Sequence, residues 1–331
     1  MIVRCHVKLF TRKITMISLP LLQAFFNKQN LIILDGGLAT ELEAQGHLLQ
    51  DKLWSARLLA SNPEAIRDVH LSYLRSGADC ITAASYQASL PGFQEAGFTK
   101  GESESLLRKS VDLACEAKDI YLKEKMHYDN QNPDPLVAAS VGPYGAWLAN
   151  GSEYTGNYGV SCDVLHGFHK PRFEILSSTP ADIYACESIP SYDEAVVLRN
   201  LLAETPGIIA WVSFTCRDGE HISDGTPLQE CAAIFNDCDV VAAIGVNCTA
   251  PKLVKSLIEK IKLGAPAKMI VVYPNSGERY CADTKTWTGE SEITAFSTFA
   301  EKWFNAGARL IGGCCRTTPG HITALKRALL K

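Results

Sequence analysis

The sequence predicts an α/β protein whose single domain is a (β/α)8 barrel of the TIM type. Eight short apolar runs alternate with amphipathic stretches from residue 31 to the end of the 331-residue chain, which indicates either such a barrel or a doubly wound sheet. No break in composition marks a linker. The turn after the first apolar run, Asp35-Gly36-Gly37-Leu38-Ala39-Thr40, lacks the G-x-G-x-x-G spacing of a dinucleotide-binding sheet. The barrel is therefore favoured.

Each predicted strand is a short run of β-branched, small or apolar residues that ends in a polar or glycine-containing segment. A parallel strand that is buried on both faces has this composition. The eight predicted strands are Leu31–Leu34, Ala78–Ala84, Leu136–Val141, Ile183–Cys186, Ile208–Phe214, Val240–Val246, Met269–Tyr273 and Arg309–Ile311.

Helix signals lie between these runs. Within Glu64–Ser76, apolar residues recur at the spacing of one helix face. Ser191 opens a capping-box pattern with Glu194 three residues later. Thr226-Pro227 and Thr318-Pro319 each place a capping residue before a proline, which predicts helices that begin at the proline.

The bulk composition excludes some classes of protein. The chain is 47% hydrophobic and 21% charged, as expected for a globular protein with a sizeable core. A net charge of −4 without a basic stripe argues against a nucleic-acid partner. No apolar run approaches the roughly 18 to 20 residues that span a bilayer, so we expect no membrane partner.

The twelve cysteines and the N-terminal segment bear on location. No secretory signal peptide or small-domain disulfide spacing accompanies the cysteines, which favours a reducing cytoplasm. Residues 1–19 are predicted to form a disordered basic extension before a barrel domain at residues 20–331, with Met16 as an alternative initiator. A mitochondrial targeting segment is the other interpretation, since no acid opposes the basic residues Arg4, Lys8, Arg12 and Lys13.

The candidate site residues follow the predicted strands, because the active site of a barrel lies at the C-terminal ends of its strands. Cys248 follows the sixth strand, and Gly312-Gly313-Cys314-Cys315 follows the eighth. These strands are two apart in the ring, so the three thiols can point into one mouth. Vicinal cysteines rarely bond to each other, because the peptide between them must distort. We therefore expect the three sulfurs to bind one soft metal ion.

Three thiolates with an open fourth position describe a catalytic zinc (Zn2+) site, since structural zinc sites are usually closed by four protein ligands. A substrate thiol at the fourth position would lose its proton on binding and become a nucleophile at neutral pH. A redox-active Cys314–Cys315 pair is the main competing interpretation.

Two carboxylates, Asp35 and Glu187, follow the first and fourth strands across the mouth from each other. A buried carboxylate needs a cation, which would be either a substrate ammonium group or a structural arginine or helix N-terminus. Gly36 and Gly37 would allow a ligand close to the backbone, or would only make a tight turn.

The segment from Tyr144 to Tyr158 is rich in aromatic residues and glycine. Its ring faces could attract a cationic ligand through cation–π contacts. The alternative is a loop that is packed by its own aromatic side chains.

Together these residues resemble the zinc-dependent homocysteine S-methyltransferases, and in particular the branch that uses S-methylmethionine or S-adenosylmethionine. The resemblance covers about residues 30 to 330. It rests on the stretches Asp35-Gly36-Gly37 with Thr40-Glu41-Leu42-Glu43, Val141-Gly142-Pro143-Tyr144-Gly145, Gly151-Ser152-Glu153-Tyr154, Glu187-Ser188-Ile189-Pro190, Gly245-Val246-Asn247-Cys248-Thr249 and Gly312-Gly313-Cys314-Cys315-Arg316.

The resemblance implies a (β/α)8 barrel in which Cys248, Cys314 and Cys315 bind zinc. It implies that carboxylates matching Asp35 and Glu187 hold the amino group of homocysteine, beside Gly36. It also places Tyr86 and Trp54 in the substrate pocket. The implied reaction transfers a methyl group from a sulfonium donor to homocysteine and yields methionine.

Other functions remain open at this stage. Betaine-dependent homocysteine methyltransferases share the zinc motif, although the loop Gly142–Tyr158 is more similar to the sulfonium-using branch. A barrel hydrolase or lyase would use Asp35 and Glu187 for acid–base chemistry. A non-enzymatic thiol or zinc-binding barrel would use only the cysteines. The preferred donor and the oligomeric state are left open.

Overall fold

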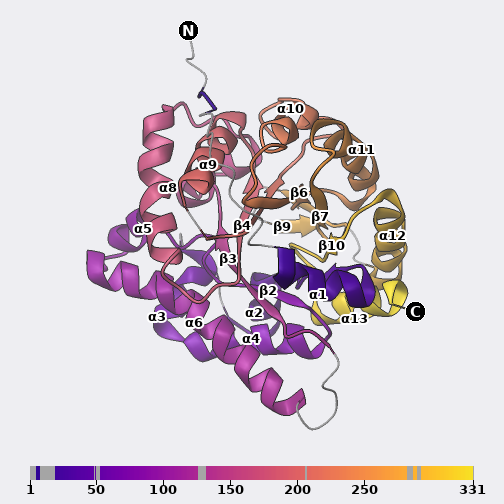
Figure 1. Cartoon of the computed structure of the whole chain (residues 1–331). Coiled ribbons are helices and arrows are strands. Elements are labelled where there is room, and N and C mark those ends of the chain that lie inside the picture. The colour runs from indigo at the N-terminus through magenta and orange to yellow at the C-terminus, as the bar shows by residue number, and fades with distance from the viewer. Residues whose placement is uncertain are drawn as a thin grey trace.

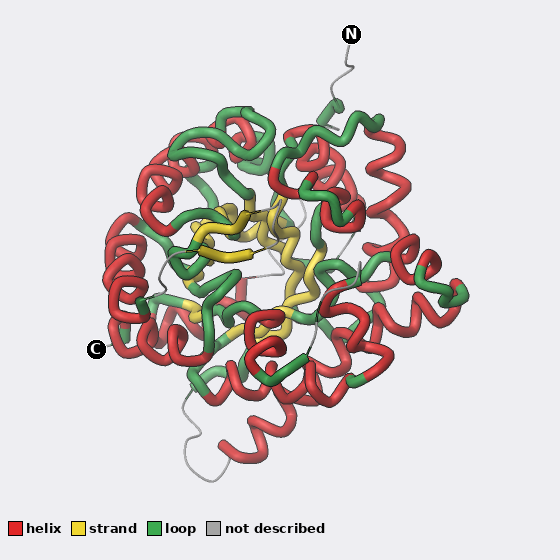
Figure 2. The backbone as a smooth tube through the Cα atoms, turned by 180° about the vertical axis from the view of Figure 1, so that it is seen from behind, coloured by secondary structure: helices red, strands yellow, loops and turns green. Residues whose placement is uncertain are grey.

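A computed structural model describes residues 5–7, 19–47, 49, 53–125, 132–205, 207–281, 286–288 and 292–330 of the chain. Its centre is a ring of parallel strands surrounded by helices (Figure 1), and the same ring of helices is visible from behind (Figure 2). The predicted single (β/α)8 barrel is confirmed.

Eight parallel strands form the barrel in the order β1-β10-β7-β6-β5-β4-β3-β2, and a parallel bridge between Leu34 and Cys80 joins β1 to β2. Every predicted strand is present. The strands are β1 (Ile32–Ile33), β2 (Cys80–Thr82), β3 (Leu136–Val141), β4 (Ile183–Ile189), β5 (Ala210–Phe214), β6 (Val241–Asn247), β7 (Met269–Tyr273) and β10 (Leu310–Ile311).

One strand boundary differs in a way that affects the site. The apolar run predicted an end at Cys186, but β4 continues to Ile189 through a register shift against β5. Ser188 has a φ of 60° within this irregularity. A bulge of this kind redirects side chains locally, so Glu187 lies inside the strand and not in the loop after it.

The α-helices of the described chain are α1 (Leu19–Gln29), α2 (Leu38–Ala44), α3 (Leu58–Ser61), α4 (Pro63–Arg75), α5 (Leu90–Glu95), α6 (Lys100–Lys125), α7 (Tyr144–Leu148), α8 (Cys162–Leu176), α9 (Tyr192–Glu204), α10 (Leu228–Ala233), α11 (Val254–Gly264), α12 (Ile293–Ala306) and α13 (Pro319–Leu329). Short 3-10 helices are η1 (Trp54–Arg57), η2 (Ser152–Tyr154) and η3 (Pro251–Leu253). An antiparallel hairpin, β8 (Arg279–Cys281) with β9 (Thr286–Thr288), was not predicted.

The helix caps mostly follow the sequence signals. Thr318 and His321 form a capping box at α13. Ser191 accepts from the backbone N–H of Glu194, but the Glu194 side chain does not return to the cap. The predicted start of α10 was wrong by one residue: Pro227 is the capping residue, because Thr226 belongs to the preceding turn, where its carbonyl accepts from Ile222.

Two apolar cores surround and fill the barrel. The larger one lies between the strands and the outer helices. The smaller one fills the N-terminal end of the barrel, where Leu22 and Phe25 of α1 pack on inward side chains such as Leu136, Ile183 and Trp211. Helix α1 lies across this end in Figure 1. It closes the barrel there within the described part of the chain.

The described N-terminal residues contact the outer helices. Cys5 is disulfide-bonded to Cys162 at the start of α8 and donates its backbone N–H to Asp193. Spacing along the chain carried no sign of this bond, because its two cysteines are 157 residues apart. The rest of the predicted basic extension, residues 1–4 and 8–18, lies outside the described residues, so the domain boundary stays a prediction. None of the described helices is long and apolar enough to cross a membrane.

Candidate metal centre and active site

A cavity of about 900 Å3 opens at the C-terminal ends of the strands, opposite α1. It is lined by five of the predicted site residues outside the cysteines and by the three cysteines themselves. Those residues are Asp35, Gly36, Gly37, Tyr86, Glu187, Cys248, Cys314 and Cys315. The barrel therefore brings the predicted metal site and the predicted substrate carboxylates into one cavity.

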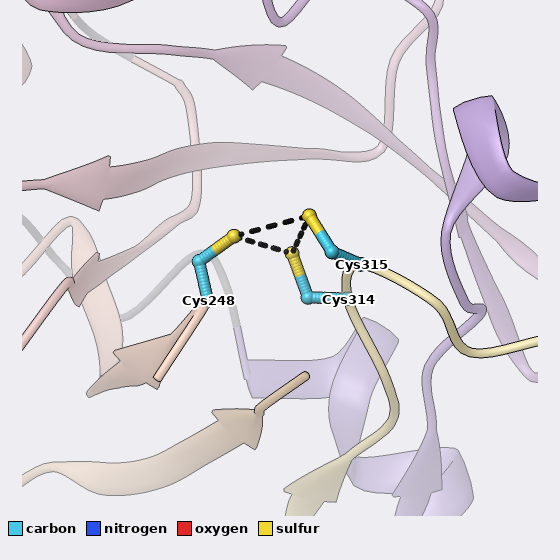
Figure 3. Close-up of side chains that lie close together, drawn as sticks. All are labelled: Cys248, Cys314 and Cys315. Carbon is cyan, nitrogen blue, oxygen red and sulfur yellow. Dashed lines mark hydrogen bonds between the residues drawn. The ribbon is translucent and has the colours of Figure 1, made fainter. Parts of the chain in front are cut away.

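The three cysteine sulfurs, which follow β6 and β10, face one another (Figure 3). Cys248 Sγ lies 3.0 Å from Cys314 Sγ and 3.5 Å from Cys315 Sγ. Cys314 Sγ and Cys315 Sγ are 4.0 Å apart. Tetrahedral zinc with sulfur ligands at about 2.3 Å would separate the sulfurs by about 3.8 Å. The donor set and its spacing fit one soft metal ion.

The backbone around Cys248 is fixed by its neighbour Asn247. The Asn247 side-chain oxygen accepts from Ser188 N at 2.7 Å and Ser213 Oγ at 2.8 Å. Its amide nitrogen donates to Ser188 Oγ and approaches Cys314 Sγ at 4.0 Å. Cys248 itself adopts a left-handed φ of 49°, which is unusual for a residue other than glycine. This conformation turns its thiol toward the cysteine pair.

The other side of the cysteine triad is held by the turn after β10. Gly313 donates its N–H to Asp35 O, and Thr317 Oγ1 donates to Cys314 O. A Cβ at Gly313 would lie 2.3 Å from Thr317 Oγ1. Glycine at this position therefore allows the turn to pack closely against Thr317 and fixes the cysteine pair beside β1.

Protons are shared unequally among the three half-buried thiols. Hydrogen bonds to Cys314 and Cys315, with burial, hold the pKa of Cys248 well above its usual range. Hydrogen bonds from Cys248 and Cys314 hold the pKa of Cys315 well below it. A bound cation would favour the thiolate form of all three groups, since opposite charge favours ionisation.

The two predicted carboxylates are both buried and face the cavity. Asp35 accepts from Thr82 N at 2.7 Å and Thr82 Oγ1 at 3.1 Å. Glu187 accepts from Ser140 Oγ. Within the described part of the chain, no arginine or lysine pairs with either group. The structural-arginine interpretation therefore does not hold for these residues.

Burial dominates the ionisation of both groups. It raises the pKa of Asp35 to about 8, against the hydrogen bonds from Thr82 and with a smaller contribution from Glu187. Burial likewise raises the pKa of Glu187 to about 7, and the Ser140 hydrogen bond opposes this shift. Two buried carboxyls without a cation form a pocket that favours a positively charged ligand.

The remaining predicted substrate residues differ in what the structure shows. Tyr86 is half-buried and lines the cavity. Gly36 also lines it, but its space is taken by the protein: a Cβ there would lie 2.8 Å from the Tyr73 ring. Trp54 lies in η1, and its side chain is outside the described structure.

The aromatic segment after β3 is packed mainly by its own side chains. The Tyr144 ring lies 5.1 Å from Trp147, 5.3 Å from Tyr158 and 5.1 Å from Phe168, between ring centroids. Only Tyr154 among these aromatic residues lines the cavity. The alternative of a self-packed loop is thus correct for most of the segment.

Two polar residues near the site were not predicted. Tyr273, at the end of β7, accepts from Trp211 Nε1 at 2.9 Å and exchanges a hydrogen bond with Ser213 Oγ at 2.6 Å. Arg172 of α8 is buried and donates to the carbonyls of Gly142, Ser85 and Tyr86. Inward alternation along β7 could have indicated Tyr273, but Arg172 lies on an outer helix and has no such signal.

Comparisons with known proteins agree with this geometry. The family model for homocysteine S-methyltransferase matches residues 32–329. The homocysteine S-methyltransferase of Escherichia coli is 48% identical over 306 residues, which cover 92% of this chain and 97% of the relative. The homocysteine S-methyltransferase YbgG of Bacillus subtilis is 47% identical over 301 residues, 91% of this chain and 95% of the relative.

The fold agrees as closely as the sequence. The crystal structure of the metallated form of the homocysteine methyltransferase MmuM from Escherichia coli matches with a TM-score of 0.83 and 45% identity, covering 92% of this chain and 99% of that one. Sequence, fold and the cavity with its three thiols lead to one assignment: the chain belongs to the homocysteine S-methyltransferase family and is a methyltransferase that acts on small molecules.

Proposed function

We propose that this chain transfers a methyl group from a sulfonium donor to homocysteine, with zinc held by Cys248, Cys314 and Cys315, and that the product is methionine. The single observation that carries the proposal is the position of three convergent thiols in the same cavity as two buried carboxyls without a cation.

Zinc is the metal that best suits this donor set. Soft thiolate ligands select zinc over magnesium or calcium, which bind oxygen ligands. Three protein ligands leave a fourth position for a substrate sulfur. When bound, zinc supplies the charge that keeps the homocysteine thiol ionised at neutral pH. The metallated form of MmuM supports a metal at this site.

Asp35 and Glu187 are suited to the homocysteine ammonium group. Both are buried, and both have acceptor oxygens that face the cavity without a protein cation. An ammonium group would reverse the rise in their pKa, because a neighbouring positive charge favours the carboxylate. The two residues would thereby orient the substrate with its sulfur toward the cysteine triad.

The chemical step is a direct substitution between two sulfurs. The homocysteine thiolate attacks the methyl carbon in line, a new S–C bond forms, and the S–C bond of the donor breaks. The bonding electron pair returns to the donor sulfur, which becomes a neutral thioether. Holding both sulfurs in one cavity supplies much of the rate, since positioning replaces a bimolecular encounter.

The experiment combines metal analysis with donor assays. The purified protein is expected to contain one zinc per chain and to form methionine from homocysteine with S-methylmethionine or S-adenosylmethionine. Betaine is assayed in parallel as the alternative donor. Full activity after removal of the metal by a chelator would contradict the proposal.

A further inference from the structure

A third carboxylate, Glu153, lines the same cavity and has no role in the site described so far. It lies in η2, within the loop that follows α7. Glu153 contributes to the electrostatic environment of Tyr86 and Tyr154, and so does the thiol of Cys248. Tyr86 and Tyr154 are therefore neighbours of both the Glu153 carboxylate and the Cys248 thiol.

One oxygen of this carboxylate lacks a hydrogen-bond partner. Glu153 Oε2 is buried, and no donor contacts it in the described part of the chain. Burial raises the pKa of Glu153, while the backbone N–H groups of Glu153 and Gly151 oppose that shift. A buried acceptor without a donor is costly, so a ligand that brings an N–H group would be favoured there.

Glycines near Glu153 let the backbone hold it in this position. Gly151, just before η2, has a φ of 86°, a conformation that favours glycine. A Cβ at Gly145 would lie 2.5 Å from Glu153 N, and a Cβ at Gly156 would lie 2.5 Å from Pro190 O. Gly151 thus permits the turn before Glu153, and Gly145 and Gly156 let the loop pack closely against Glu153 N and Pro190 O.

A buried network also anchors the loop to the helices outside the barrel. Glu194 accepts from Tyr144 N at 2.5 Å and from Tyr158 Oη at 2.8 Å. It also contacts His169 Nε2 at 2.8 Å. These contacts hold the loop on both sides of Glu153, which makes the position of its side chain a fixed feature of the cavity.

We propose that Glu153 Oε2 accepts an N–H of the α-ammonium group of the methyl donor and selects amino-acid sulfonium donors over betaine. The inference rests on the proposed function. Transfer between two amino acids brings a second ammonium group into the cavity, and Asp35 with Glu187 is assigned to the ammonium group of homocysteine. Betaine has no ammonium group: its single nitrogen is the quaternary one that carries the transferred methyl, so it offers no N–H to this oxygen.

The test compares Glu153→Gln with Glu174→Gln in the zinc-loaded enzyme. Glu174 is an exposed glutamate of the outer helix α8 and does not line the cavity, so its substitution is a control for the same chemical change outside the site. Loss of a charged hydrogen bond raises the KM for S-methylmethionine by roughly 10- to 100-fold in Glu153→Gln. The KM for homocysteine and the zinc content stay within twofold of wild type, and Glu174→Gln resembles wild type throughout.

A donor analogue tests the same contact from the ligand side. Dimethylsulfoniopropionate has the sulfonium group but lacks the ammonium group. Wild type should prefer S-methylmethionine in kcat/KM by at least about tenfold, and Glu153→Gln should lose most of that preference. If Glu153→Gln does not fold, Glu153→Asp, which withdraws the carboxylate, should give the same change with smaller size.

The outcomes separate this inference from the proposed function. An equal donor KM in wild type and Glu153→Gln, an unchanged preference over the analogue, or a rise in the homocysteine KM instead would overturn the role of Glu153 alone. If the wild-type enzyme transfers no methyl group from any sulfonium donor to homocysteine, the proposed function itself fails.

Discussion

The two ends of the barrel interior differ in chemistry. At the N-terminal end, Leu22 and Phe25 of α1 pack on apolar strand side chains and close the barrel. At the C-terminal end, the buried carboxyls of Asp35 and Glu187 and the half-buried cysteine triad surround a cavity. One end stabilises the fold by removing apolar area from water. The other retains polar groups whose best partners are ligands.

The boundary between these ends is a thin polar layer. Trp211 belongs to the core at the N-terminal end of the barrel, yet its Nε1 donates to Tyr273 Oη. Tyr273 in turn contacts Ser213, whose hydroxyl donates to Asn247. Apolar packing thus gives way to hydrogen bonding at this layer. Substitutions on its N-terminal side should mainly change stability, and substitutions on its C-terminal side should mainly change metal or substrate binding.

Among substitutions at the C-terminal end of the barrel, Cys248→Ala should have the largest effect on activity. Loss of one of three metal ligands should remove the metal and lower kcat/KM by about a thousandfold or more, because several kcal/mol of charge stabilisation disappear. Metal content by mass spectrometry and methionine formation are measured together. The matched control is Cys216→Ala: this thiol follows β5 near the same mouth but is not one of the three convergent sulfurs. An active, metal-free Cys248→Ala protein would contradict the assignment.

Phe25→Ala tests the N-terminal end of the barrel. Phe25 is fully buried in the core that α1 shares with the strands. Its truncation should lower the free energy of unfolding by about 3 to 5 kcal/mol, as measured by denaturant titration. The KM for homocysteine should stay within twofold of wild type. A comparable loss of substrate affinity would show that the two ends are coupled.

Glu187→Gln has a smaller effect and should act on one substrate. It removes the charge but keeps the shape, so the KM for homocysteine should rise by roughly 10- to 100-fold. Asp79→Asn is the matched control, because Asp79 is a carboxyl directly before β2 that accepts from Ile33 N and Gln29 Nε2 and does not line the cavity. Equal effects of the two variants on homocysteine would remove the distinction between the ends.

The pH dependence of stability tests the C-terminal end of the barrel without a substrate. The pKa of Asp35 rises from its usual 3.8 to about 8 on folding. Between these values the folded state binds the proton that the unfolded state has lost, so this group stabilises the fold less as pH rises. The stability of Asp35→Asn relative to wild type should therefore increase between about pH 5 and pH 8 in ligand-free protein. A difference that does not change with pH, in unfolding titrations, would contradict the assigned shift.

Local patterns in the sequence determined the framework of this protein. The eight strands follow from short apolar runs, and the helix starts at Ser191 and Thr318 follow from their capping residues. The three metal-binding candidates also followed, since strand ends of a barrel share one mouth. These features depend on residues close in the chain, or on a ring order that the barrel itself imposes.

Only the tertiary structure decided which polar groups have partners. Asn247 contacts Ser188, 59 residues away in the chain. The Glu194 side chain does not complete the predicted capping box but accepts hydrogen bonds from Tyr144 N and Tyr158 Oη. The unsatisfied oxygen of Glu153 is visible only once every neighbour is placed. Hydrogen bonds of this kind tolerate a change of only a few tenths of an ångström in the donor–acceptor distance. Closure of the barrel sets these distances between segments that are far apart in the chain.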